Sequence, residues 1–173
     1  MNEKSKNDEN KDRKISDKQF GILLKASLVI GIIIISGFII YYIFTPEPGY
    51  VTFGILNENR EAENYPTEVS VNETIYFYLT VGNYLDREFN FRFKIKKGNN
   101  DTVMSSVMGS DGSLYLTSGN FTLEHNNETI FGDYNMSFSE IGVNQIVIAE
   151  LWQIKNEVEE FYNIIWLRLN ITN

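Results

Sequence analysis

The amino-acid sequence predicts an all-β domain, an antiparallel β-sandwich of about seven or eight strands, preceded by a single transmembrane α-helix. Three observations predict this fold class: an uncharged apolar run near the N-terminus, apolar and polar residues alternating with a period of two after it, and turn residues between the alternating segments. We divide the chain into a disordered cytoplasmic tail (1–24), a transmembrane helix (25–44), a linker (45–49) and an extracellular β-sandwich domain (50–173).

The apolar run ASLVIGIIIISGFIIYYIF (26–44) has 19 residues and no charge. A helix of this length spans about 28 Å, which is close to the hydrocarbon thickness of a bilayer. Tyr41, Tyr42 and Phe44 end the run, and the two prolines of TPEPG follow. Interfacial aromatics and helix-breaking prolines are typical of a span that stays in the lipid bilayer, whereas a cleaved signal peptide has a shorter apolar core.

The charges on the two sides of this run differ. Seven Lys and Arg residues precede the run, and none follows it until Arg60. The positive-inside rule therefore predicts a single-pass protein of the plasma membrane, with the N-terminus in the cytoplasm and the C-terminal domain outside. The tail itself mixes charges with almost no apolar residues, so we expect it to be disordered.

Composition excludes several classes of protein. The chain has no cysteine, so disulfide-stapled modules, cysteine metal sites and thiol nucleophiles are excluded. Its net charge of −8 argues against nucleic acid as a partner, because such binding needs clustered Lys and Arg.

The clearest strand pattern lies between residues 75 and 96. In EFNFRFKIKKG apolar residues alternate with Asn, Arg and Lys, and in TIYFYLTV they alternate with Tyr and Thr. The turn residues of GNYLD join the two segments, so we predict a β-hairpin. Shorter strands are expected at 50–57 and 67–71, where Pro66 suits a strand start or edge.

Further strands follow later in the chain. Short strands are expected near LYLT, NFTLE and YNMSFSEI, and two long ones in NQIVIAELWQIK and FYNIIWLRLNIT. In the strand at 145–154 both parities are apolar, which predicts a central strand covered on both sides but leaves its core face open. A helix over 145–163 is the alternative, because ELWQIKNEVEEFY contains helix formers.

Asn-x-Ser/Thr triplets support the outside location of the domain. All six lie after the apolar run, where composition alone would give about two or three. We predict N-linked glycans at these positions: Asn72, Asn100, Asn120, Asn127, Asn135 and Asn170.

The residues form no recognisable catalytic set, so the sequence predicts neither an enzyme nor a cofactor. His125 is the only histidine and stands in a polar stretch, where a solvated loop residue is expected rather than a catalytic base. A calcium site using Asp111, Asp133 or the GNND loop (98–101) lacks the regular spacing of a known oxygen-ligand loop. We predict no metal site, and whether a weak calcium site exists stays open.

Aromatic residues make up 14% of the chain, and four of them are expected opposite the core stripes or close to them. An exposed aromatic patch would be a docking surface, while burial between the sheets or under loops is the alternative. The candidate interaction residues are Tyr76, Tyr78, Trp152 and Trp166.

The stretch AENYPTEVSVNETIYFYLTVGN (62–83) resembles the start of the extracellular domain in an archaeal membrane-protein family of unknown function, domain of unknown function 1616. The family's pattern A-E-x-Y-P-T-x-V-x-V-x-E, followed by a strand ending V-x-N, is matched by Ala62, Glu63, Tyr65, Pro66, Thr67, Val69, Val71, Glu73, Val81 and Asn83. The closing segments AELWQIK and IIWLRLNIT are also similar. The resemblance implies an archaeal cell-surface location and an immunoglobulin-like fold, and it carries over no catalytic residue.

Two departures from that family stand in the sequence. Longer members have several membrane helices before this domain, whereas this chain has one apolar run, and Tyr84 and Leu85 replace the usual His and Glu. The function we expect is a non-catalytic accessory or interaction module of the cell envelope with a membrane or envelope protein as partner. The alternative is a glycan-binding or adhesion domain that uses exposed aromatics, and a small hydrolase using carboxylates is a third class.

Overall fold

The structure is a computed structural model that describes residues 3–45 and 48–173, with the side chains of 18–45 and 48–173. The chain divides into two compact units, 1–47 and 48–173. Of the predicted linker 45–49, residues 46 and 47 lie outside the described residues, as do residues 1 and 2 of the predicted tail.

The first unit contains one helix, α1 (Glu3–Phe44). Its segment Lys18–Phe44 has 27 residues and contains an 18-residue stretch with a mean hydropathy of 2.5, so it is long and apolar enough to cross a membrane. The prediction of a disordered tail over 1–24 differs from the structure, because the helix already begins at Glu3. The sequence of the tail includes several good helix formers.

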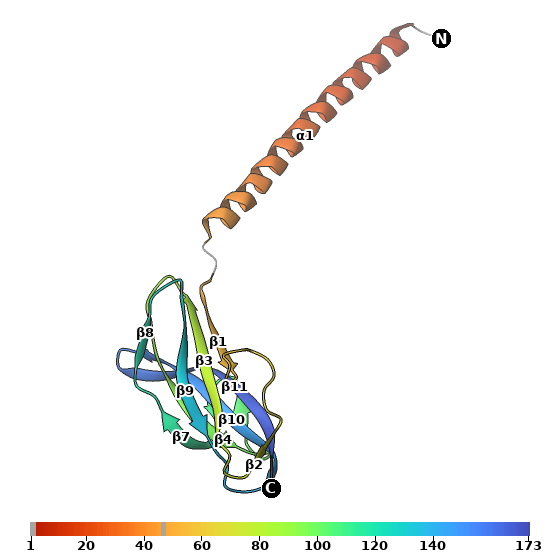
Figure 1. Ribbon diagram of the computed structural model, residues 1–173. Coiled ribbons are helices and arrows are strands. Elements are labelled where there is room, and N and C mark those ends of the chain that lie inside the picture. Colours follow the sequence, from red (N-terminus) through yellow and green to blue (C-terminus); the bar gives the residue numbers. More distant parts are fainter. Residues whose placement is uncertain (1–2, 46–47) are drawn as a thin grey trace. The chain divides into compact units, whose positions relative to one another are not determined.

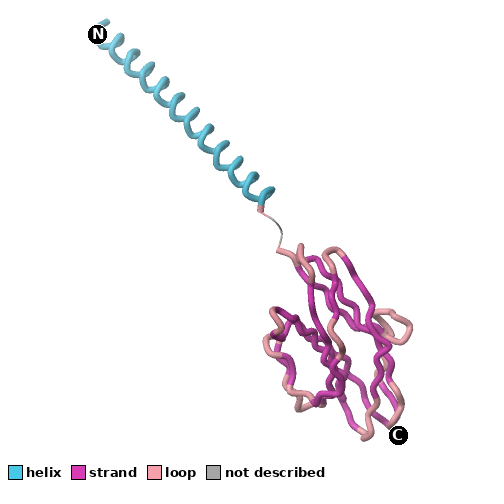
Figure 2. The backbone as a smooth tube through the Cα atoms, turned by 90° about the vertical axis from the view of Figure 1, so that its left-hand side faces the viewer, coloured by secondary structure: helices cyan, strands magenta, loops and turns pink. Residues whose placement is uncertain are grey.

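The second unit is built from strands, and in Figure 2 every regular element of residues 48–173 is a strand. Sheet A has the order β1-β3-β9. Sheet B has the order β2-β11-β10-β4-β7, with β8 also paired to β4, and β5 pairs only with β6. The strands, labelled in Figure 1 except for β5 and β6, are β1 (Tyr50–Leu56), β2 (Glu68–Ser70), β3 (Ile75–Tyr84), β4 (Phe89–Gly98), β5 (Met104–Ser105), β6 (Gly109–Ser110), β7 (Ser113–Thr117), β8 (Phe121–Leu123), β9 (Asn127–Met136), β10 (Gly142–Lys155) and β11 (Val158–Thr172).

A mostly β unit after an apolar helix confirms the coarse fold prediction. Residues 48–173 contain eleven strands rather than about seven or eight, and two of the eleven, β5 and β6, are a pair of two residues each within a loop. Most strand pairs are antiparallel, but β2 and β11 run parallel. The prediction of purely antiparallel sheets is therefore wrong for this pair. The strand expected at YNMSFSEI is the end of β9, which already begins at Asn127.

The two sheets face each other across one apolar core. Alternation places one face of β3 and one face of β4 in this core, as their sequences predict. From sheet A come Ile75, Phe77, Leu79 and Val81, and from sheet B come Phe89, Phe91, Phe93, Ile95, Val147, Ala149, Leu151, Leu169 and Ile171. Each sheet thereby covers the apolar face of the other, and the other face of each sheet points outward.

The predicted hairpin between β3 and β4 is wrong, because the two strands belong to different sheets. The fully buried Asn83 holds the chain where it crosses between them. Its Nδ2 donates to the carbonyls of Arg87 (2.7 Å) and Leu123 (2.8 Å), and its Oδ1 accepts from the Leu85 amide (3.1 Å). These bonds close an arch instead of a two-strand turn, so the two apolar stripes face each other across the core.

The structure decides the core face of β10 and excludes the helix alternative for 145–163. Val147, Ala149 and Leu151 face the shared core. Ile148, on the other face, is fully buried, and its Cδ1 lies close to Gly98 and Gly112. The segment 99–112, which contains β5 and β6, therefore covers the outer face of this central strand, as the apolar residues of both parities predict.

Buried and half-buried polar residues also hold the loop before β2. Asn57 accepts at Oδ1 from the amides of Asn59 (2.8 Å) and Glu61 (3.0 Å) and donates to the Glu63 carbonyl (2.8 Å). The Tyr65 hydroxyl donates to the Ile55 carbonyl in β1 (2.6 Å), and burial raises the pKa of that hydroxyl. The AENYPT segment is thus tied to the edge of sheet A.

Candidate functional site

A band of charged residues crosses the outer face of sheet B and is called the charged strip below. It consists of Arg92, Lys94 and Lys96 on β4, Glu150 on β10 and Glu159 on β11. The alternation of β4 places its cations on this face because the opposite face is in the core. With three cations and two carboxylates, 3 − 2 leaves the strip a formal charge of +1.

Glu150 is the buried centre of the strip, with no exposed surface. Its Oε1 lies 2.9 Å from Lys96 Nζ and accepts from the Ser110 amide (2.6 Å) and hydroxyl (2.8 Å), while Oε2 accepts from Trp152 Nε1 (2.9 Å). Burial raises the pKa of this carboxyl, but the bonds from Lys96, Ser110 and Trp152 together lower it below its usual value. Glu150 is therefore ionised at neutral pH and fully paired.

Gly109 allows β6 to lie directly on this carboxylate. It has a φ of +85°, and a Cβ added there would lie 2.8 Å from Glu150 Oε1. Sequence reasoning did not single out Gly109, Ser110 or Glu150 as a unit. One signal was present: Glu150 is the single acid in the apolar run IVIAELW, and a buried carboxylate needs a partner.

Glu159 organises the other end of the strip. Its Oε1 lies 2.8 Å from Arg92 Nη1, and its Oε2 accepts from Lys94 Nζ at 2.5 Å. The hydrogen bond from Lys94 lowers the pKa of the Glu159 carboxyl most. Burial acts in the opposite direction, but the charges of Lys94 and Arg92 lower the pKa further, so it ends below its usual value. The Lys94 ammonium also lies 3.8 Å from the ring centroid of Trp152. The charges of the strip are thus paired with one another, as in a structural network rather than an acid–base pair.

The four predicted interaction aromatics do not form one patch. Tyr76 and Tyr78 stand on the outward face of β3 in sheet A, whereas Trp152 and Trp166 stand on the outward face of sheet B. Arg60 lies 4.9 Å from the Tyr78 ring centroid, and Lys94 covers Trp152, so both rings already have a cation neighbour. Tyr76 and Trp166 are left more open, at 45% and 44% exposure.

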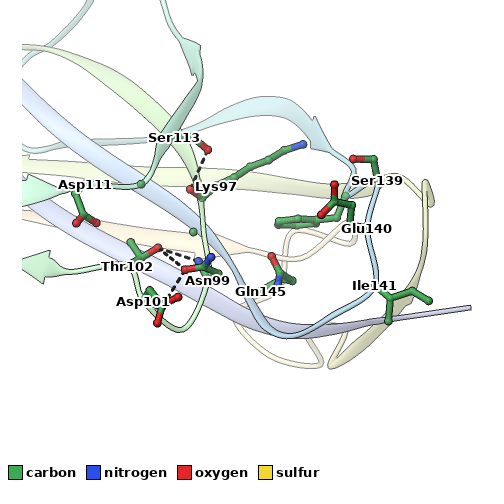
Figure 3. A pocket seen from close by; sticks show the side chains of 13 residues that line it. Lys97, Asn99, Asp101, Thr102, Asp111, Ser113, Ser139, Glu140, Ile141 and Gln145 are labelled. Atoms are coloured by element: carbon green, nitrogen blue, oxygen red, sulfur yellow. Dashed lines mark hydrogen bonds between the residues drawn. The ribbon is translucent and has the colours of Figure 1, made fainter.

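A polar pocket of about 520 Å³ lies at the end of sheet B where β4 ends and β7 and β10 begin. In Figure 3, Asn99, Asp101 and Thr102 lie on one side of it and Ser139 and Glu140 on the other. Because β4 has ten residues, the pocket lies about 30 Å from the other end of this strand, at Phe89. The Lys97 ammonium lines the pocket but is already engaged, since it donates to the Ser137 carbonyl and lies 5.2 Å from the Phe138 ring centroid.

The residues weighed for a calcium site separate in the fold. Asp101 and Asp111 both line this pocket, while Asp133 is on β9 and does not. Asp111 Oδ1 accepts from the Val103 amide (2.9 Å) and so has a local structural role. Within residues 3–45 and 48–173 no group of three or more His, Cys, Asp or Glu side chains is placed to hold a metal ion.

His125 is exposed in the turn after β8 and contacts Asp86 there. Its Nδ1 accepts from the Asp86 amide (3.0 Å), and its Nε2 lies 3.1 Å from Asp86 Oδ1. Both residues lie beside the crossing held by Asn83. The contact therefore fastens two loops at that end of the unit.

Five of the six glycosylation triplets have an exposed asparagine, and Asn170 is half-buried. Asn170 lies between the buried Leu169 and Ile171, and its Oδ1 accepts from the Asn144 amide (3.0 Å). At Asn120 the side-chain oxygen accepts from Arg92 Nε (2.9 Å), which leaves the Nδ2 amide free to point elsewhere. The exposed members are Asn72, Asn100, Asn120, Asn127 and Asn135.

Comparison with protein-family models finds no match, and neither does comparison with curated proteins. Among solved structures, a crystal structure of a CARDB domain in complex with di-metal ions from Pyrococcus furiosus is similar with a TM-score of 0.49 and 16% identity, covering 75% of this chain and 93% of that one.

A solution structure of the same CARDB domain is similar with a TM-score of 0.48 and 14% identity, over 73% of this chain and 98% of that one. A β-glucosidase from Listeria innocua in complex with glucose is similar with a TM-score of 0.44 and 9% identity, over 72% of this chain but only 16% of the enzyme. These values assign the chain to no family, and the fold described above stands on its own sheets and core.

Proposed function

We propose that the chain is a single-pass membrane protein, anchored by residues 25–44, that carries an extracellular, glycosylated and non-catalytic β-sandwich. In this proposal the β-unit is of the immunoglobulin-like class and serves as an accessory or interaction module of an archaeal cell envelope. The observation that carries the proposal is a helix segment, Lys18–Phe44, long and apolar enough to span a bilayer, in a chain whose remaining unit is built from strands.

The charge distribution supports the orientation. Seven cations precede the apolar run, and all six glycosylation triplets follow it. Five of these six asparagines are exposed on the β-unit, where a glycosylating enzyme can reach them.

The state of the carboxylates supports a non-catalytic role. Within residues 18–45 and 48–173, Glu150 and Glu159 are acids with a lowered pKa, and both are ion-paired with lysines in the charged strip. A general acid needs a raised carboxyl pKa, which neither has. The resemblance of residues 62–83 to the archaeal membrane family is consistent with this proposal and supplies the archaeal part of it.

The topology can be tested with single cysteines, because the natural chain has none. Ser5→Cys marks the tail, and Ser106→Cys marks the exposed turn between β5 and β6. A membrane-impermeant maleimide applied to intact cells is expected to label Ser106→Cys and to label Ser5→Cys only after permeabilisation. The reverse pattern, or a mature protein that lacks residues 1–44, would contradict the proposed anchor.

The partner is best sought from native membranes. We propose Trp166 as a contact residue, since it is 44% exposed on the outward face of β11. Cross-linking followed by purification is expected to yield one membrane or envelope protein in fixed ratio, with less of it for Trp166→Ala. Tyr115→Ala on β7, where the ring is also 44% exposed, is the matched control. A consistently lone protein that binds a glycan array would favour the adhesion alternative instead.

A further inference from the structure

Asn135 and Tyr76 face each other across two strands of sheet A. The antiparallel register of β3 and β9 pairs Tyr76 directly with Asn135. Both neighbours of Tyr76 on β3, Ile75 and Phe77, point into the core, so Tyr76 points outward. Met136, next to Asn135, is fully buried, which places the Asn135 side chain on the same outward face.

Both side chains of this pair are accessible. Tyr76 is 45% exposed, and Asn135 is exposed on β9, a strand at the edge of sheet A. Directly opposed residues of an antiparallel pair have Cβ atoms about 4.5–5.5 Å apart. A group joined to the Asn135 side chain therefore begins within reach of the Tyr76 ring.

We propose that the ring of Tyr76 is the platform on which the first sugar of an N-glycan at Asn135 packs. This inference rests on the proposed glycosylation of the β-unit. The C–H groups of a pyranose carry partial positive charge, and the face of an aromatic ring is electronegative, so the two surfaces attract while excluding water. The partner of Tyr76 is then the chain's own glycan rather than another protein.

Asn135 is distinguished from the other triplets by its cross-strand neighbour. Asn127, Asn135 and Asn170 have a partner residue in the strand registers, and of these only Asn135 faces an aromatic ring. Asn127 is opposite Asn83, whose amide is used in the arch, and Asn170 is opposite Glu68. At Asn120 the neighbour is the Arg92 guanidinium.

The contact has a consequence for the edge of sheet A. An edge strand presents unpaired backbone groups to other chains. A glycan held down on Tyr76 lies beside the end of β9 and keeps foreign strands from pairing there. The ordered sugar also links β9 to β3, which stabilises the pair.

The test uses the full chain in detergent, produced in a host that attaches N-glycans. Glycopeptide mass spectrometry first reports the occupancy of Asn135. The unfolding equilibrium constant is then measured for the natural chain, Tyr76→Leu, Asn135→Gln and the double variant. We expect Tyr76→Leu to raise this constant about twofold to fivefold more when the glycan is present than when Asn135→Gln has removed it.

Two controls isolate the sugar. The same four chains made in a host without N-glycosylation are expected to show additive effects. Tyr115→Leu, at a ring of similar exposure on β7, is expected to be additive with Asn135→Gln in both hosts. A readout independent of stability is the ring-current shift of the first sugar's proton resonances, which Tyr76→Leu should abolish.

The outcomes are distinguishable. An occupied Asn135 with additive effects and no ring-current shift overturns the packing proposal and leaves the proposed glycosylation intact. An unoccupied Asn135 overturns both at this position, and the mass spectrum alone shows it. Coupling that appears only in the glycosylated chain, together with the shift, supports the proposal.

Discussion

Asn83 uses both ends of its amide to hold three backbone groups at the crossing between the sheets. Replacing it by alanine leaves the carbonyls of Arg87 and Leu123 without this donor. We expect Asn83→Ala to lower the free energy of unfolding by about 2–3 kcal/mol, because buried polar groups that lose their partner keep the full cost of desolvation.

Denaturant unfolding measures the change for Asn83→Ala. The matched control is Asn90→Ala, since Asn90 is exposed on β4 and has one side-chain contact, with Thr122. It should change the free energy of unfolding by about 0.5 kcal/mol or less. Equal effects of the two substitutions would show that the crossing does not depend on Asn83.

Glu150 links stability to acid pH. Its folded-state pKa lies below the ordinary value of 4.5, so its contribution to stability is present above about pH 4.5 and is lost as the pH falls through the folded pKa. Glu150→Gln should lower the free energy of unfolding at neutral pH by about 3 kcal/mol, because the half-buried Lys96 loses its counter-charge. The variant should also lose this part of the acid dependence.

Unfolding free energies measured from neutral to acid pH check this prediction. Glu160→Gln is the control, because Glu160 is exposed and pairs with the exposed Lys155 at 2.9 Å. Exposed pairs contribute at most about 1 kcal/mol. The prediction fails if Glu150→Gln and the natural chain have parallel pH profiles.

Tyr134 links stability to alkaline pH in the opposite sense. Burial raises its pKa from 10.0 to about 12, so the unfolded chain ionises first as the pH rises. Stability is fully present below pH 10 and declines between pH 10 and 12. Tyr134→Phe should remove this part of the decline, which unfolding at several alkaline pH values would show.

At the scale of elements, the position of Asn170 within β11 determines how accessible its glycosylation triplet is. Asn170 pairs with Glu68 of β2, its amide donates to the Thr67 carbonyl (2.8 Å), and its side chain holds Asn144. We expect Asn170 to stay unmodified while Asn72, in the exposed turn after β2, is modified, because Asn170 is half-buried within β11 and its side-chain orientation is held by the Asn144 amide, so its Nδ2 is less accessible to a glycosylating enzyme. Glycopeptide mass spectrometry of the natural chain compares the two sites, and an occupied Asn170 would contradict the prediction.

The crossing of β3 to β4 and the 99–112 segment show how elements were misjudged from sequence. The alternation of β3 and of β4 predicts both strands, because a period of two is a local property, whereas the two-residue strands β5 and β6 show no such pattern. Which strands pair is not local: the contact of Ser110 with Glu150 joins residues 40 positions apart. No spacing in the sequence marks such a pair.

At the scale of the molecule, the core cluster lies wholly within residues 48–173. We therefore expect a chain of residues 48–173 alone to fold, with a β-type circular dichroism spectrum and the denaturation midpoint of the full chain in detergent. A chain of residues 75–173 is the control. It lacks β1 and β2, which supply one edge strand to each sheet, and should not fold. Failure of 48–173 to fold would mean that the β-unit depends on the first 47 residues.

The sequence by itself determined the apolar helix, the mostly β unit and the core faces of β3 and β4. These follow from hydropathy and alternation, which depend only on neighbouring residues. The central place of β10 was also predicted, because apolar residues of both parities require cover on both faces.

Only the tertiary structure decided which surfaces those residues share. The four aromatics predicted as interaction residues are divided between the outward faces of two sheets, because β3 belongs to sheet A whereas β10 and β11 belong to sheet B. Glu150 can be buried and ionised because Lys96, Ser110 and Trp152 surround its carboxylate. Tyr76 has Asn135 as its neighbour because of the β3–β9 register. Strand pairing depends on contacts between distant residues, so no local pattern in the sequence specifies it.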